Sequence, residues 1–364
     1  MAKHNPANAR IKREYFSYLK EANRRDEASI DMIAKALARF EEANGHKDFR
    51  NFRRQQAIAF KRKLDEQHNV RTGKPLSRAT VNSTLAALRA FFHWLAGQPG
   101  YKSRLQYADA DYFNLSEKDV RVAKAVRHKS FPTLEQVHHV ISLMPCVTDI
   151  EKRNRALIAF TILTGARIKA LSTFKLKHFN LEEGRVDQDA RDVATKASKS
   201  FSTWLLPVGG DALQIVQDWC TYLRTELLRG DDDALFPETQ MGIGEHGGFQ
   251  PVGLHRNGWK STGPIRAIFR NAFAEANLPY FNPHSFRDTL VQFGERNSPN
   301  IEVFKAWSLN LGHTNIGTTL NSYGSMSPNR QAELIRNFNV LKARDAINPA
   351  ALALMKAAIA AMDQ

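Results

Sequence analysis

The 364-residue sequence contains only two cysteines, Cys146 and Cys220, and they do not form a CxxC pair. This scarcity excludes a disulfide scaffold and a cysteine-rich zinc module, so both thiols are expected to be small buried side chains. No apolar run approaches the roughly 20 residues that a membrane span needs. The first residues lack the apolar segment of a secretory signal. We therefore expect a protein of a reducing compartment without a membrane partner.

Acidic residues are too few to balance the basic ones. The chain has 52 Lys and Arg against 37 Asp and Glu, which gives a formal net charge of +15. Residues 1–130 hold 27 basic and 14 acidic residues, whereas the rest of the chain holds 25 and 23. The positive charge is thus concentrated in an N-terminal module, which is expected to bind a polyanion. Nucleic acid fits this expectation better than an anionic membrane.

The N-terminal part has apolar residues at the spacing of amphipathic helices. Four helices are expected, over residues 12–23, 29–42, 51–67 and 78–96. Ser77 is expected to cap the last of them. Residues 1–110 are therefore interpreted as a small basic helical domain. Residues 111–130 are polar and basic without sustained periodicity, so we expect a linker there.

The remaining sequence mixes helices with short strands. Three strands are expected, over residues 178–181, 184–193 and 201–208. Helices are expected over residues 153–163, 211–228, 265–276, 284–296, 301–309, 328–338 and 350–362. The Gly-rich residues 229–264 are expected to form a long loop. The predicted fold class is mainly α with a small β-sheet (α+β). A second domain spans 131–345, and the C-terminal helix of 346–364 is a candidate for protomer contacts.

Three short stretches of the second domain contain the residue types that phosphoryl transfer needs. The stretch Thr-Gly-Ala-Arg-Ile places Arg167 after a tight turn at the end of an apolar helix. His-Ser-Phe-Arg places His284 and Arg287 three positions apart, and so on one helix face. Leu-Gly-His ends at His313 and is followed ten residues later by Tyr323. Guanidinium groups can hold phosphate oxygens, imidazoles can move protons and a phenol can attack phosphorus.

Together and in this order, these motifs resemble the signature of the tyrosine recombinase (phage integrase) family. The basic helical domain is similar to that family's core-binding domain, which has a SAM-like fold. The resemblance implies a site-specific DNA recombinase that cuts and rejoins duplex DNA through a 3′-phosphotyrosyl intermediate. It implies no cofactor, metal or ATP. Four protomers would assemble on two recombination sites, in the cytoplasm at the nucleoid, and a bacterium, phage or mobile element would encode the protein.

The family's roles carry over to individual residues of this chain. Arg167 and Arg287 would hold the scissile phosphate and stabilise its transition-state charge. His284 would assist proton transfer from the nucleophile, and His313 would hydrogen-bond the phosphate. Tyr323 would be the nucleophile.

The family also uses a lysine on a β-hairpin as the general acid for the leaving oxygen. Lys196, between the second and third expected strands, is favoured for this role, and Lys199 is the alternative. One departure from the family pattern concerns the support of the site. Many members carry an acidic residue three positions after the first arginine, and here that position is Ala170.

Basic residues of the N-terminal domain are candidates for phosphate contacts, namely Arg53, Arg54, Lys61, Arg78 and Arg89. Two other functions stay open. A type IB topoisomerase would share the chemistry but relax DNA without exchanging partners, and a catalytically silent protein would only bind DNA. The separate helical domain favours recombination over the first, and the complete set of Arg, His and Tyr residues argues against the second.

Overall fold

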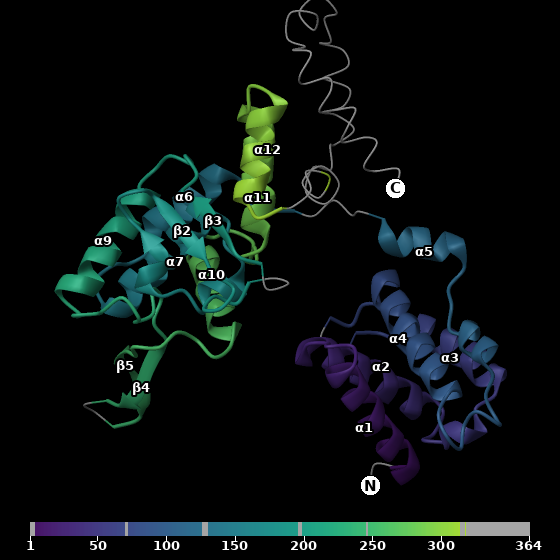
Figure 1. The fold of residues 1–364 in the computed structure, drawn as a ribbon. Coiled ribbons are helices and arrows are strands. Elements are labelled where there is room, and N and C mark those ends of the chain that lie inside the picture. Colours follow the sequence, from purple (N-terminus) through teal and green to yellow (C-terminus); the bar gives the residue numbers. More distant parts are fainter. Residues whose placement is uncertain are drawn as a thin grey trace, which may run out of the picture. The chain divides into compact units, whose positions relative to one another are not determined.

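The chain divides into two compact units, Met1–Ala125 and Val126–Gln364 (Figure 1). The computed structural model describes residues 4–69, 72–125, 130–195, 199–244, 247–313 and 317. Both units are mainly helical, and the short strands all belong to the second. The predicted α+β fold class, mainly helical with little sheet, is confirmed. Within the described residues, no helix is long and apolar enough to cross a membrane.

The N-terminal unit packs amphipathic helices around an aromatic core. Its helices are α1 (Pro6–Glu21), α2 (Glu27–Ala43), α3 (Arg54–Glu66), α4 (Arg78–Ala96) and α5 (Glu117–Lys124). The four predicted helices correspond to α1–α4, and Ser77 caps α4 by accepting a hydrogen bond from the Thr80 amide at 3.2 Å. Phe40 and Phe92 are buried and pack edge to face, with ring centroids 5.5 Å apart. Aromatic packing between helices therefore holds this unit together.

The stretch 111–130, where we expected a linker, contains helix α5. Ser116 caps this helix by accepting a hydrogen bond from the Asp119 amide at 3.1 Å. Just before it, Phe113 is 1% exposed and packs on Phe92 with centroids 5.0 Å apart. The stretch as far as Ala125 thus belongs to the N-terminal unit. Eight residues make only about two helical turns, and α5 buries none of them, so no apolar stripe marks it in the sequence.

The C-terminal unit has at its core the apolar helix α7 (Asp149–Thr164), which is buried on all sides from Ala156 to its end. The other helices of this unit are α6 (Leu134–Leu143), α8 (Ile168–Leu171), α9 (Ala212–Thr225), α10 (Gly263–Glu275), α11 (Ser285–Asn297) and α12 (Ile301–Asn310). Each helix predicted within the described residues is confirmed. The expected helices over 328–338 and 350–362 lie outside these residues.

Each of the three predicted ranges contains a strand, but the second and third strands end four or five residues earlier than expected, and the three form one antiparallel sheet. They are β1 (Phe179–Asn180), β2 (Arg185–Gln188) and β3 (Phe201–Trp204), in this order. The sheet is fastened to the end of α12, where the Thr203 hydroxyl donates to the Asn310 carbonyl at 3.0 Å. The Asn310 side chain also accepts from the Trp204 amide at 2.7 Å and donates to its carbonyl at 2.8 Å. This docking places β3 beside the segment that leads to His313.

The expectation of a loop throughout 229–264 is wrong. Strands β4 (Thr239–Ile243) and β5 (Phe249–Leu254) form a second antiparallel sheet, a hairpin that extends away from the helices (Figure 1). Glycines hide the alternation of apolar and polar side chains by which a strand is recognised. At Gly242, for example, a Cβ atom would lie 3.0 Å from Val252 of the opposite strand, so this position is occupied by the neighbour's side chain.

The two cysteines differ in burial. Cys220 is buried as expected, and burial raises the pKa of its thiol to about 12. Cys146 is exposed, so that expectation is wrong for it. It follows Pro145 in the connection between α6 and α7, where a small side chain need not be buried.

Candidate active site

The guanidinium of Arg287 connects the three sequence motifs. Arg287 lies in the first turn of α11 and is 2% exposed. Its Nη1 donates to the carbonyl of Gly165 at 2.6 Å, and its Nη2 donates to the carbonyl of Leu311. The same Nη2 lies 2.8 Å from Nε2 of His313. One buried cation is thus held by the turn before Arg167 and by the Leu-Gly-His segment.

Two glycines allow these segments to approach Arg287. Gly165 ends α7 in the left-handed conformation, with φ of +60°, and a Cβ there would lie 2.7 Å from Leu311 Cδ2. Gly312 has φ of +71°, and its Cβ would lie 2.6 Å from the ring of Phe201 in β3. Only glycine adopts this backbone freely and leaves room for such close packing. The glycines of the motifs therefore make room for the groups that hold the Arg287 guanidinium. These groups are the Gly165 carbonyl, the Leu311 carbonyl and His313, and we call them the cradle of Arg287.

Arg167 is presented differently. It is partly exposed and directly precedes the single turn of α8. Within the described residues, its guanidinium makes no hydrogen bond or ion pair. Only one residue separates it from Gly165, whose carbonyl holds Arg287. The site therefore contains one fixed guanidinium and a second one on the same turn that is available to an anion.

The two histidines occupy different environments. His284 is exposed at the start of α11, and its backbone amide donates to Asn282 Oδ1 at 3.0 Å. His313 is 4% exposed. Because a guanidinium only donates hydrogen bonds, His313 Nε2 would be the acceptor in its contact with Arg287. Arg287 thus lies against the Nε2 side of the buried His313 ring.

The structure brings together part of the predicted set. Arg287 and His313 are in contact, and Arg167 follows the turn whose Gly165 carbonyl holds Arg287. His284 lies at the same end of α11 as Arg287. Lys196 and Tyr323 lie outside the described residues. Lys199, the alternative general acid, is exposed shortly before β3.

Most candidates for phosphate contact in the N-terminal unit already have partners. Three arginines form ion pairs, Arg54 with Asp109, Arg78 with Asp65 and Arg89 with Asp111. Lys61 donates to Asn114 Oδ1 at 3.2 Å. Arg53 makes no ion pair with any residue that the structure describes. Exposed ion pairs are weak, so phosphate can replace them, but Arg53 has no such partner to lose.

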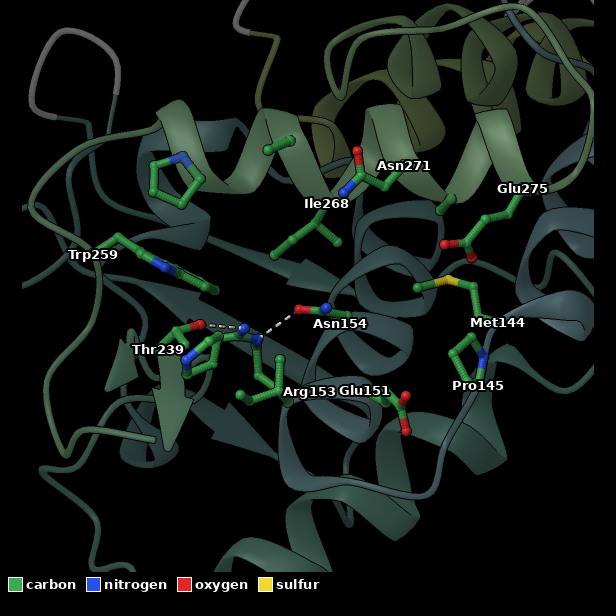
Figure 2. Close-up of a pocket in the computed structure, with 15 residues that line it drawn as sticks. Met144, Pro145, Glu151, Arg153, Asn154, Thr239, Trp259, Ile268, Asn271 and Glu275 are labelled. Carbon is green, nitrogen blue, oxygen red and sulfur yellow. Dashed lines mark hydrogen bonds between the residues drawn. The ribbon is translucent and has the colours of Figure 1, made fainter. Parts of the chain in front are cut away.

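A pocket of about 360 Å³ lies in the C-terminal unit, at the root of the β4–β5 hairpin (Figure 2). Arg153 at its floor is 1% exposed, donates to Thr239 Oγ1 at 2.9 Å and lies over the Trp259 ring at 4.8 Å. Burial lowers the pKa of Arg153 to about 10. None of the described motif residues lines this pocket. The bond from Arg153 to Thr239 attaches strand β4 to helix α7.

Comparison with known families agrees with the motifs. The model of the phage integrase family matches residues 133–330, which is more than half of the chain. The model described as the phage integrase N-terminal SAM-like domain matches residues 13–98. The chain belongs to the phage integrase family, and the predicted family membership is confirmed.

Individual relatives cover only part of the chain. Tyrosine recombinase XerC of Escherichia coli O157:H7 is 32% identical over 165 residues, which are 45% of this chain and 48% of that protein. The chain thus spans about half the length of the curated relatives that it matches.

Solved structures are similar in fold. The XerH site-specific recombinase bound to a palindromic difH substrate has a TM-score of 0.59 and 17% identity, over 90% of this chain and 84% of that one. A lambda integrase dimer bound to a COC′ core site has a TM-score of 0.56 and 12% identity, over 84% and 92%.

Proposed function

We propose that this chain is a site-specific DNA recombinase that cuts and rejoins duplex DNA through a 3′-phosphotyrosyl intermediate. The observation that carries the proposal is the cradle of Arg287, which joins Gly165, Leu311 and His313. A guanidinium held in this way keeps its direction before substrate arrives, as electrostatic stabilisation of a phosphoryl transition state requires. The placement of Arg167 on the adjoining turn supports a two-arginine clamp on one phosphate.

The proposed reaction is a transesterification. The phenolic oxygen of Tyr323 attacks the scissile phosphorus with assistance from His284, and the bond from phosphorus to the 5′-oxygen breaks. The leaving oxygen takes a proton from Lys196, or from Lys199 in the alternative, and becomes a 5′-hydroxyl. Resealing reverses these steps with the 5′-hydroxyl of another strand. Because one phosphodiester bond is exchanged for another, the reaction needs no ATP.

The proposed partner is duplex DNA, with four copies of this chain on two recombination sites in the compartment that holds the DNA. The excess of basic residues in 1–130 supports contact with phosphates. The similar lambda integrase and XerH structures each contain their own DNA site. Exchange between two duplexes requires two pairs of cuts, and four protomers supply one nucleophile for each.

The test begins with a library of nicked duplexes that carry randomised central sequences. Strands that remain attached to the protein in SDS are sequenced and made into a nicked suicide substrate. The wild-type protein and Tyr280→Phe, a control at an exposed tyrosine of the same unit, should both form the covalent complex. Tyr323→Phe should form none while it still shifts the duplex in a gel.

Three outcomes would contradict the proposal. Covalent attachment by Tyr323→Phe would mean that another residue is the nucleophile. Plasmid relaxation without strand exchange between two sites would indicate a topoisomerase. Binding by the wild-type protein without any covalent product would indicate a protein that only binds DNA.

A further inference from the structure

Thr173 connects the turn of Arg167 with the loop that leads to Lys196. It follows α8, and its hydroxyl accepts a hydrogen bond from the backbone amide of Ala194 at 2.9 Å. The same oxygen lies 3.2 Å from the carbonyl of Ala170, to which its proton can be donated. A single side chain thus bonds to both segments, and Ala194 is only two residues before Lys196.

The loop between β2 and β3 is braced within itself. The Val193 amide donates to the Asp189 carbonyl at 2.7 Å, and the Val193 side chain is 2% exposed. The Ala190 amide donates to Ser200 Oγ at 3.0 Å, which joins the outgoing and returning sides. These bonds keep the shape of the loop base, whereas the bond of Thr173 sets its position relative to the arginine turn.

An exposed ion pair adds a second attachment. Lys177 Nζ lies 2.8 Å from Asp192 Oδ2, but both side chains are more than a third exposed to solvent. Such pairs contribute little to stability and are screened by salt. His178 Nε2 also lies 3.5 Å from Asp192 Oδ2, and the Val193 side chain packs in the core of the unit. Among these attachments, the Thr173 bond is the one closest in sequence to Lys196.

Ala170 stands where many family members have an acidic residue, and its methyl side chain is 1% exposed. We infer that Thr173 is a positioning residue that holds the general-acid loop against the Arg167 turn. This inference rests on the proposed function, with Lys196 or Lys199 as the acid. A general acid acts only within hydrogen-bond reach of the leaving oxygen, and a displacement of 1 Å can cost about 100-fold in rate.

The test compares two leaving groups. Single-turnover cleavage is measured on the suicide duplex and on a duplex with a bridging 5′-sulfur, whose thiolate leaves without a proton. Thr173→Val keeps the shape of the side chain but removes the hydroxyl. We expect it to cleave the oxygen substrate about 30-fold more slowly and the sulfur substrate within about threefold of the wild-type rate. Thr173→Ser, which keeps the hydroxyl, should stay within about threefold on both.

The matched control is Thr161→Val. Thr161 is a buried threonine of α7 whose hydroxyl donates to the Leu157 carbonyl at 2.7 Å and does not contact the loop. This variant should show the wild-type ratio of oxygen to sulfur rates. Circular dichroism and thermal unfolding of all three variants would show that the chains are folded. A general loss of stability in Thr173→Val would slow both substrates alike, and that result would overturn the positioning role.

The lysine variants separate this inference from the proposed function. If Lys196→Ala or Lys199→Ala is rescued by sulfur and Thr173→Val is not, the general-acid assignment stands and the inference is wrong. If neither lysine variant is rescued, the general acid lies elsewhere and the inference falls with that assignment. If the wild-type protein forms no covalent complex with any duplex, the proposed function itself is wrong.

Discussion

Replacing Gly165 by alanine should lower the free energy of unfolding of the C-terminal unit by about 3 kcal/mol. The left-handed backbone at φ of +60° costs a residue with a Cβ roughly 1 kcal/mol. The new Cβ would also lie 2.7 Å from Leu311 Cδ2 and 3.1 Å from Leu290 Cδ1. Both leucines are at most 1% exposed, so neither can move into solvent. Crowding of a packed core adds roughly 2 kcal/mol.

Gly209→Ala is the matched control for this prediction. Gly209 lies in the same unit and has φ of +71°, but a Cβ there would have no atom within 4 Å. It should therefore cost only the backbone contribution of roughly 1 kcal/mol. The difference of about 2 kcal/mol between the two variants isolates the contact with Leu311 and Leu290.

Urea unfolding followed by tryptophan fluorescence measures both values. Four of the five tryptophans belong to the C-terminal unit, namely Trp204, Trp219, Trp259 and Trp307. Gly165→Ala should also cleave DNA more slowly under conditions where it is folded, because the Gly165 carbonyl holds Arg287. Equal free energies of unfolding for Gly165→Ala and Gly209→Ala would refute the close packing at Gly165.

Three further predictions follow from single side chains. Arg287→Lys keeps the charge but cannot reach both the Gly165 and the Leu311 carbonyl, so the rate of single-turnover cleavage should fall by at least about 100-fold. A rate near that of the wild type would contradict the role of the guanidinium. A thiol reagent should react with Cys146 in the native protein and with Cys220 only in denaturant, because burial raises the pKa of Cys220 to about 12. Rapid reaction of both thiols in the native protein would contradict this prediction. Arg53→Ala should weaken duplex binding more than Arg89→Ala does, since Arg89 already has a carboxylate partner. Filter binding over a salt series measures both affinities, and a larger loss for Arg89→Ala would contradict this reasoning.

The fold was predictable where an apolar stripe runs through several helical turns. Helix α4 begins and ends at the expected residues, 78 and 96, because its stripe is long and a serine cap precedes it. Helix α5 and the β4–β5 hairpin were missed because neither has a regular apolar pattern. The helix has no buried residue, and glycines such as Gly242 interrupt the alternation of apolar and polar side chains in the hairpin.

The contacts of the candidate site were less predictable than its list of residues, which stays a prediction. The motifs named Arg287 and His313 as members of one site, and Arg287 Nη2 lies 2.8 Å from His313 Nε2. The other partners of Arg287 are backbone carbonyls, which every residue has, so no side-chain pattern could single out Gly165 and Leu311. Thr173 escaped notice for a similar reason, since its partner is the amide of Ala194.

The two arginines of the proposed clamp differ in what phosphate binding costs them. Arg287 is held by two carbonyls before any ligand arrives, so little rotamer freedom remains to be lost. The guanidinium of Arg167 makes no hydrogen bond within the described part of the chain, and fixing such a side chain costs about 2 kcal/mol of conformational entropy. Binding a phosphate should therefore cost Arg167 more side-chain entropy than it costs Arg287. In the proposed reaction, the other DNA contacts that hold the scissile phosphate against this turn would offset that cost.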